Sequence, residues 1–154
     1  MGRSENSNTA EDLLQLSQQL CFALYAATHA FNRAYKPLLA PLELTYPQYL
    51  VMLVLWEADD LTVKEIGSRL QLDSGTLTPL LKRLETARLV ERVRDSADER
   101  QVRVHLTESG RALRKKAEGI PKKLAQAIGR PIPDIVALRQ QLTDLRARMD
   151  AVAG

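Results

Sequence analysis

The amino-acid sequence predicts a mainly helical chain with one small β-hairpin. Apolar residues recur at three- and four-residue steps along most of the chain, the periodicity of an amphipathic helix. The period changes to two only across residues 90–106, where apolar and charged side chains alternate. A helix, a short turn and a second amphipathic helix directly precede that stretch.

Composition restricts the class of protein. The chain has 154 residues, of which 45% are hydrophobic and 27% charged, as in a globular domain. No apolar run approaches the roughly 18 residues that span a bilayer. Residues 1–10 are polar, lack the pattern of a secretory signal and are expected to be disordered. We therefore expect a cytoplasmic protein with no membrane partner, and its one cysteine, Cys21, excludes an intramolecular disulfide.

Charge is distributed unevenly along the chain. The first 61 residues carry 3 basic and 7 acidic side chains, whereas residues 62–154 carry 19 basic and 12 acidic ones. This asymmetry fits a polyanionic partner, although a solvated basic surface gives the same pattern.

The N-terminal third predicts two helices. A helical pattern starts near Glu11, and Lys36-Pro37 interrupts it, because the residue before proline avoids the helical region. The segment from Thr45 to Glu57 is apolar nearly all round, which is typical of a buried helix. The apolar face of the first helix comprises Leu13, Leu16, Leu20, Leu24, Ala27 and Phe31.

The middle of the chain predicts a helix-turn-helix. Thr62 and Glu65 have the spacing of a capping box at the start of a short helix that ends near Leu72. Asp73 or Ser74 can cap the second helix. The second helix places apolar residues inward and contains Pro79; its apolar positions are Leu77, Leu80, Leu81 and Leu84.

Two alternating segments follow, Val90 to Arg94 and Val102 to Leu106, separated by a polar, turn-prone segment. They predict a β-hairpin with a charged tip. A helix-turn-helix followed by such a hairpin is a winged helix-turn-helix, a DNA-binding fold.

The C-terminal third predicts two more helices. Thr107 can cap a long one, and Pro131 and Pro133 separate it from the last. The last helix carries a heptad seam, for which packing on its own domain and a dimer interface are both open; we favour a homodimer. The inward positions of the two helices are Leu113, Ala117, Ile120, Leu124 and Ile128, then Ile135, Leu138, Leu142, Leu145, Met149 and Val152.

These elements predict four regions: a disordered N-terminus (1–10), dimerisation and sensor helices (11–60), a winged helix-turn-helix (61–106) and C-terminal dimerisation helices (107–154). The N- and C-terminal helices together would form the dimerisation domain.

The second helix of the helix-turn-helix would enter the DNA major groove, where base edges are distinguishable. At the hairpin tip, Asp98 would orient Arg100 toward the narrow minor groove; an ordinary solvated turn is the alternative. A dimer would place two such helices about 34 Å apart and so require an inverted-repeat operator in double-stranded DNA. The candidate DNA-binding residues are Asp73, Ser74, Thr76, Thr78, Lys82, Arg83, Asp98 and Arg100.

Residues from Glu11 to about Ala117 resemble the MarR family of bacterial regulators, and in particular its organic hydroperoxide resistance subgroup of the one-cysteine type. The segments that carry the resemblance are LCFALYA (20–26), YKPLL (35–39), TYPQYL (45–50), LTVKEIG (61–67) and LDSGTLTPLLKRLE (72–85). The resemblance implies a repressor in which Cys21 senses organic hydroperoxides while Tyr25 and Tyr35 hold its sulfur. Oxidation then releases the operator and derepresses peroxide-resistance genes.

The spacing of these residues is compatible with that role. Cys21 and Tyr25 are four residues apart and share a helix face, and a phenol that donates to sulfur favours the reactive thiolate. Tyr35 lies about 21 Å farther along a continuous helix, so it reaches Cys21 only across a dimer interface or after a chain reversal; the resemblance implies the partner subunit. Taken alone, a cysteine on an apolar helix is usually a small buried hydrophobe.

Because there is no second cysteine, a sulfenic acid at Cys21 would react with a low-molecular-weight thiol, a backbone nitrogen or more peroxide. We expect a sulfenate to weaken DNA binding and a mixed disulfide to complete release.

Two other functions remain open. One is a regulator that binds a phenolic or drug-like ligand, with Cys21 inert and a pocket lined by Phe31, Tyr46, Tyr49 and Trp56; the other is a thiol peroxidase, which lacks a companion motif. His29 and His105 do not form a metal site, and there is no nucleotide or cofactor motif. We expect no enzyme and no cofactor.

Overall fold

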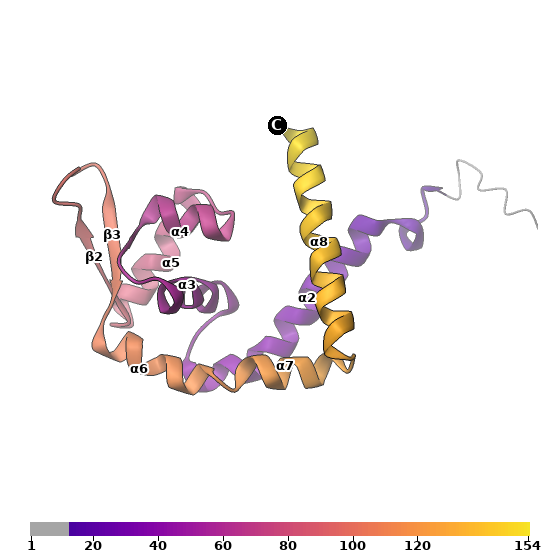
Figure 1. Ribbon diagram of the computed structural model, residues 1–154, viewed down its shortest axis with the longest axis horizontal. Coiled ribbons are helices and arrows are strands. Elements are labelled where there is room, and N and C mark those ends of the chain that lie inside the picture. The colour runs from indigo at the N-terminus through magenta and orange to yellow at the C-terminus, as the bar shows by residue number, and fades with distance from the viewer. Residues whose placement is uncertain (1–12) are drawn as a thin grey trace, which may run out of the picture.

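The structure, a computed structural model, describes residues 13–154. The predicted disorder of residues 1–10 lies outside this range. The fold is mainly helical with one small antiparallel sheet, as expected from the sequence (Figure 1). Figure 1 shows the winged helix on one side of the molecule, with helix α8 standing apart from it and the start of the N-terminal helix extending beyond α8.

The first helix of this region, α2 (Leu20–Leu39), differs from the prediction at both ends. The predicted start near Glu11 lies outside the described residues, but the predicted helix is not continuous: a short 3₁₀ helix, η1 (Leu16–Gln18), precedes α2, and the extended Gln19 separates the two. The Gln19 side-chain amide donates to the carbonyl oxygens of Leu13 and Gln15, which stabilises the turn instead of a continuous helix.

Pro37 does not interrupt α2, contrary to the prediction. It lies inside the last turn, where the missing N–H costs one hydrogen bond and the helix ends two residues later. The backbone beyond the proline remains helical, because the N–H of the C-cap residue Ala40 bonds the Lys36 carbonyl. The 3₁₀ turn η2 (Ala40–Leu42) then leads to the next helix.

Helix α3 (Tyr46–Glu57) confirms the predicted buried helix. Its capping box joins Thr45 and Gln48, and its buried residues include Val51, Met52 and Leu55. Protein covers most of the helix, although Leu53 is 39% exposed, and this burial explains its nearly continuous apolar sequence.

The helix-turn-helix consists of α4 (Val63–Leu70) and α5 (Ser74–Thr86). The predicted capping box of Thr62 and Glu65 is present, and Asp73, not Ser74, caps α5. Gln71 ends α4 in the left-handed region with φ of 57°, so the chain turns within three residues.

The predicted hairpin is formed by β2 (Val90–Arg94) and β3 (Val102–Leu106), with Val90 opposite Leu106 and Arg94 opposite Val102. A two-residue strand, β1 (Leu61–Thr62), adds to β3 and was not predicted, because two residues carry no periodicity. The strand order is β1-β3-β2, so β3 is central and β2 is an edge strand.

The predicted long helix after Thr107 is instead two helices, α6 (Glu108–Ala117) and α7 (Ile120–Ile128). Pro121 lies at the start of α7, where it lacks an N–H and would clash with the carbonyl four residues earlier. Thr107 caps α6 as expected. The last helix, α8 (Ile132–Ala153), is continuous, with Pro133 tolerated in its first turn.

The hydrophobic core lies in the winged helix and the elements next to it. All the buried hydrophobic residues of the described chain fall between Leu39 and Ile120, and α8 contributes none. Within residues 13–154, no single helix is long and apolar enough to cross a membrane, although the bent pair 20–42 and 46–57 together has a sufficient length and composition.

Candidate DNA-binding surface and redox site

The start of α5, helix α4 and the wing surround one open groove. It has a volume of about 850 Å³, and the side chains that line it belong to three separate segments. The polar and charged side chains that line it include Thr62, Lys64, Ser68, Asp73, Ser74, Thr78, Arg100 and Gln101. The structure therefore brings four of the predicted DNA-binding residues, two at the start of α5, one inside it and one on the wing, to a common surface.

The N-terminus of α5 is ordered by its own side chains. Asp73 Oδ1 accepts the Thr76 N–H at 2.7 Å, and this bond lowers the pKa of the carboxyl group. The Thr78 hydroxyl donates to the Ser74 carbonyl at 2.7 Å. Asp73 thus acts as a helix cap in this structure and also interacts with the Thr76 side chain, whereas the side chains of Ser74 and Thr76 remain exposed.

Lys82 and Arg83 lie farther along α5 and are exposed. Neither makes an ion pair with any residue from 13 to 154 in the structure. Free cations on an exposed helix surface are suited to phosphate contacts.

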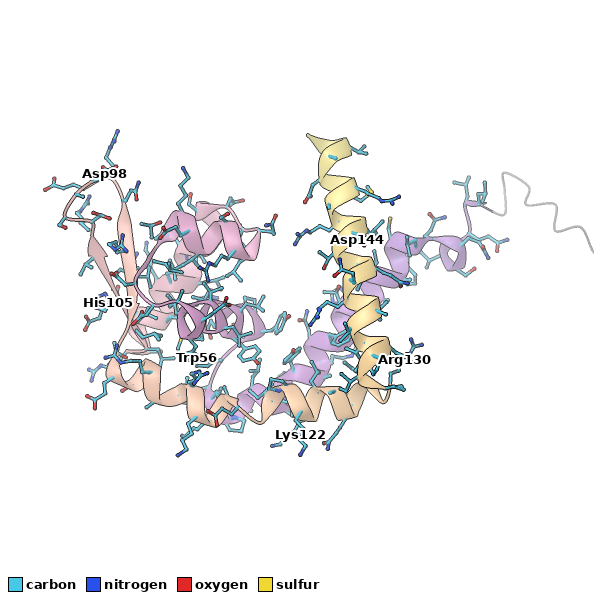
Figure 2. All side chains as sticks on the ribbon, in the orientation of Figure 1. Trp56, Asp98, His105, Lys122, Arg130 and Asp144 are labelled. Carbon is cyan, nitrogen blue, oxygen red and sulfur yellow. The ribbon has the colours of Figure 1, made fainter. Side chains whose placement is uncertain are left out.

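The tip of the wing has the geometry that the sequence suggested. Asp98 Oδ1 accepts from Arg100 Nε at 3.0 Å, and Oδ2 accepts from Nη2 at 3.3 Å. These hydrogen bonds lower the pKa of Asp98. The Arg100 side chain is 91% exposed, so Asp98 orients a guanidinium that otherwise extends into solvent. In Figure 2, Asp98 marks the outer end of the hairpin.

An ion pair between α5 and β2, which the sequence analysis missed, fixes the wing against the second helix. Glu85 accepts from the backbone N–H of Arg92 at 3.1 Å and from its guanidinium Nη2 at 3.1 Å. The pKa of Glu85 is lowered, chiefly by these bonds from Arg92. Neither residue lies on an apolar face, so periodicity carried no signal for the pair.

The end of α3 is also tied to the wing and to α6. Trp56 Nε1 donates to the Gly110 carbonyl at 2.9 Å, and Asp59 accepts the Leu106 N–H at 2.8 Å. Gly110 fits closely here, because a Cβ at this position would lie 2.1 Å from the Leu89 carbonyl oxygen. The central helix and the hairpin therefore form one packed unit.

Cys21 lies in the first turn of α2 and is exposed. Tyr25, one turn farther along, is 64% exposed and makes an edge contact with His29, with ring centroids 4.4 Å apart. Because side chains on a helix generally lean toward its N-terminus, we expect the Tyr25 side chain to lie on the Cys21 side of its own turn. The role of His29 as a neighbour of Tyr25 was not expected from the sequence.

Tyr35 lies at the other end of α2, in a cluster with Tyr46 and Tyr49. Its ring centroid is 4.6 Å from that of Tyr46 and 5.8 Å from that of Tyr49. Burial, together with these two phenols, raises the pKa of Tyr35 to about 12, so its hydroxyl keeps its proton and can act as a donor. Because α2 is continuous between the two positions, Tyr35 cannot reach Cys21 of its own chain.

The four aromatic residues considered for a ligand pocket do not share one cavity. Tyr49 and Trp56, with Leu53 and Arg114, line a cavity of about 310 Å³. Phe31 instead lines a smaller one, between α2 and α7, of about 170 Å³. His105 pairs with Glu91 at 2.9 Å, and residues 13–154 contain no cluster of His, Cys, Asp and Glu that could hold a metal ion.

Comparison with known proteins gives consistent results. Residues 33–117 match the SarA/Rot family of transcriptional regulators. The chain is 55% identical to the HTH-type transcriptional regulator TtmR of Methylorubrum extorquens over 99% of its own length and 78% of that protein. It is 54% identical to the organic hydroperoxide resistance transcriptional regulator of Bacillus subtilis over 71% of its length and 75% of that protein. These relatives are regulators and not enzymes.

The solved structures include AbfR of Staphylococcus epidermidis, in its reduced form bound to DNA. That chain is 31% identical and superimposes with a TM-score of 0.80, over 95% of this chain and 100% of the other. The overoxidised form of AbfR bound to DNA is also similar, with 33% identity and a TM-score of 0.71 over 90% and 98%.

Proposed function

Since the chain belongs to the MarR/SarA family of transcriptional regulators, we propose that it is a homodimeric repressor that releases its operator when an organic hydroperoxide oxidises Cys21. One observation carries the sensing part of this proposal. The single cysteine lies exposed on α2, one turn from Tyr25, in a chain that is 54% identical to a protein named for organic hydroperoxide resistance.

Dimerisation is supported by apolar side chains that one copy leaves uncovered. Leu138, Leu142 and Met149 on α8 are 44%, 41% and 57% exposed, at heptad spacing. Leu20 and Phe22 on α2 are also exposed. A long helix with such a seam is stabilised when a second copy covers it.

The proposed DNA contacts follow from the groove between α5 and the wing. Ser74, Thr76 and Thr78 would meet base edges or phosphates in the major groove, and Lys82 and Arg83 the backbone. Arg100, oriented by Asp98, would enter the flanking minor groove. Two copies then bind an inverted repeat with half-sites about 34 Å apart.

The proposed chemistry starts with attack of the Cys21 thiolate on the terminal oxygen of a hydroperoxide. An S–O bond forms while the O–O bond breaks; the sulfur is oxidised to a sulfenic acid, and the hydroperoxide is reduced to an alkoxide, which takes up a proton. Tyr25 of the same chain and Tyr35 of the partner subunit would donate hydrogen bonds to the sulfur. The raised pKa of Tyr35 keeps that hydroxyl protonated for this purpose.

The second step uses a low-molecular-weight thiol, because the sequence holds no second cysteine. The sulfur of the small thiol attacks the Cys21 sulfur, and a mixed disulfide forms as the S–O bond of the sulfenic acid breaks. The displaced hydroxide takes the proton of the thiol and leaves as water. Its bulk at the start of α2 would force the two copies to shift. A coupling of about 1–3 kcal/mol between the interface and the wings changes operator affinity roughly 5- to 150-fold.

A second candidate function is favoured by the cavity at Trp56. Tyr49 and Trp56 give it aromatic walls, and the charged residues Glu57, Arg114 and Glu118 also line it, so it suits a small phenolic or drug-like ligand. In that case Cys21 is inert and the same operator is released by ligand.

The test is operator release measured by fluorescence anisotropy. The probe is a duplex of about 30 base pairs, selected by the wild-type protein from a random library. Cumene hydroperoxide and a small thiol should release the wild-type protein but not Cys21→Ser, while Tyr25→Phe and Tyr35→Phe bind normally and respond more slowly. Release of Cys21→Ser by peroxide refutes sensing at this residue. If both proteins bind DNA and ignore peroxide, the ligand-responsive regulator is favoured.

A further inference from the structure

A continuous chain of hydrogen bonds runs from the turn after α3 to the tip of the wing. Its members, in order, are Asp60, Arg103, Asp95, Asp98 and Arg100. The two ends belong to different parts of the molecule: Asp60 follows the central helix of the core, whereas Arg100 lies at the far end of the hairpin, next to the labelled Asp98 of Figure 2.

Arg103 is the central link. Its Nε donates to Asp60 Oδ1 at 3.0 Å, its Nη2 to the Asp60 carbonyl at 2.6 Å, and its Nη1 to Asp95 Oδ2 at 3.2 Å. The side chains of Arg103 and Asp95 are only 33% and 13% exposed, so this ion pair is partly sheltered from solvent. Charge-assisted bonds with this geometry are stronger than neutral ones.

The position of the Arg103 guanidinium depends on the backbone conformation at Asp60, because Arg103 bonds both the side chain and the carbonyl of that residue. Asp60 has a φ of 59°, in the left-handed region that residues other than glycine seldom adopt. Because both the side chain and the carbonyl of Asp60 accept from Arg103, a rotation of this turn would break both bonds together.

The other half of the chain lies in the wing. Asp95 Oδ1 accepts the backbone N–H groups of Ala97 and Asp98, at 2.7 and 3.3 Å. Asp98 in turn accepts from the backbone N–H of Arg100 at 3.1 Å and from its guanidinium. Each link therefore orients the acceptor of the next one.

We propose that Arg103 is a positioning residue for DNA binding: through Asp95 and Asp98 it fixes the direction of Arg100 relative to the end of α3. This inference rests on the proposed function, since it assumes that Arg100 contacts the operator. It also assigns a role to the acidic residues of the wing, which by charge alone would repel DNA.

The proposal is tested by whether DNA affinity rises or falls when an acidic residue of the wing loses its charge. Removing a carboxylate near DNA strengthens binding if only charge matters. Asp95→Asn removes the charge but also presents amide hydrogens to the Arg103 guanidinium, which breaks the chain. Glu99→Gln is the matched control, because within residues 13–154 the structure gives the Glu99 side chain no hydrogen bond or ion pair.

The experiment measures the affinity of each variant for the selected duplex by fluorescence anisotropy. Asp95→Asn is expected to bind about 5-fold more weakly, a loss that corresponds to roughly one typical hydrogen bond, and Glu99→Gln equally well or more tightly. In an Arg100→Ala background, Asp95→Asn should have no further effect within about twofold, because residues that act through one another are not additive.

Tighter binding of Asp95→Asn, or an equal loss with and without Arg100, overturns the proposal. If Arg100→Ala itself binds like wild type, the wing-tip contact is absent and the proposal fails with it. If the wild-type protein selects no duplex, the proposed function fails instead. Arg103→Lys gives the second variant: it keeps the charge but cannot span both aspartates, and it should weaken binding only when Arg100 is present.

Discussion

The winged helix buries its apolar side chains within one chain, whereas the terminal helices leave many of theirs exposed. In the winged helix, Leu77, Leu81 and Leu84 of α5 are fully buried. On α8, residues at equally regular spacing stay exposed, and this helix of 22 residues contributes no buried side chain.

The helix ends differ in the same way. Helices α3, α4, α5 and α6 each begin with a side-chain cap, whereas α2, α7 and α8 have none. The winged helix, with the helices α3 and α6 that flank it, therefore satisfies its core and its helix ends within one chain. The terminal helices depend on contacts that a single copy does not supply, which is the physical reason to expect a second copy there.

The largest effect should come from a charge in the α8 seam. Leu142→Arg places a guanidinium where a second copy would pack, and burial of an unpaired charge is costly. We expect a monomer by analytical ultracentrifugation and operator binding weakened by more than about 100-fold, because the second half-site no longer adds to the first.

The control for this variant is Gln141→Arg, which adds the same side chain one position off the seam and should stay dimeric. If Leu142→Arg remains a dimer with normal operator affinity, the seam packs within its own chain, and the contrast between the two regions disappears.

Truncating one leucine in each region sharpens the comparison. In the monomeric Leu142→Arg background, Leu81→Ala should lower the free energy of unfolding by about 2–5 kcal/mol, because it leaves a cavity in a closed core. Leu138→Ala, on the 44% exposed side chain of α8, should lower it by less than about 1 kcal/mol. Urea denaturation gives both values, and equal losses would show that α8 is already packed in the monomer.

The sequence predicted the parts of the fold that depend on local chemistry. Thr62 with Glu65 and Thr107 cap their helices as expected, and the alternation between Val90 and Leu106 marks the hairpin. Each of these signals is complete within a few residues. The pairing of Asp98 with Arg100 was also predicted, since the two residues are neighbours in one turn.

The rest depends on segments that are far apart in the sequence. Strand β1 exists only because β3 lies beside it, and Arg103 meets an aspartate 43 positions away. The cluster of Tyr35, Tyr46 and Tyr49 forms where α2 turns back onto α3. The break before Pro121 was missed because the apolar spacing continues across it.

The smallest effect concerns the ion pair between α5 and the wing. Arg92 lowers the pKa of Glu85 in the folded protein below its value in the unfolded chain, which is about 4.5. The pair therefore adds to the free energy of unfolding in full at pH values above about 4.5. This contribution is lost as the pH falls through the lower, folded pKa. Because both side chains are partly exposed, at 24% and 40%, we expect a contribution of less than about 1 kcal/mol.

Thermal melts of wild type and Glu85→Gln from pH 7 to pH 3 measure this contribution. The difference between the two proteins should be constant above about pH 5.5 and should shrink below about pH 4.5, where the wild-type carboxylate is progressively protonated. Asp150→Asn, which removes the exposed carboxylate 3.8 Å from Arg146 on α8, is the control and should melt like wild type at pH 7. A Glu85→Gln difference that stays constant down to pH 3 would mean that the wing is held to α5 by packing rather than by this charge.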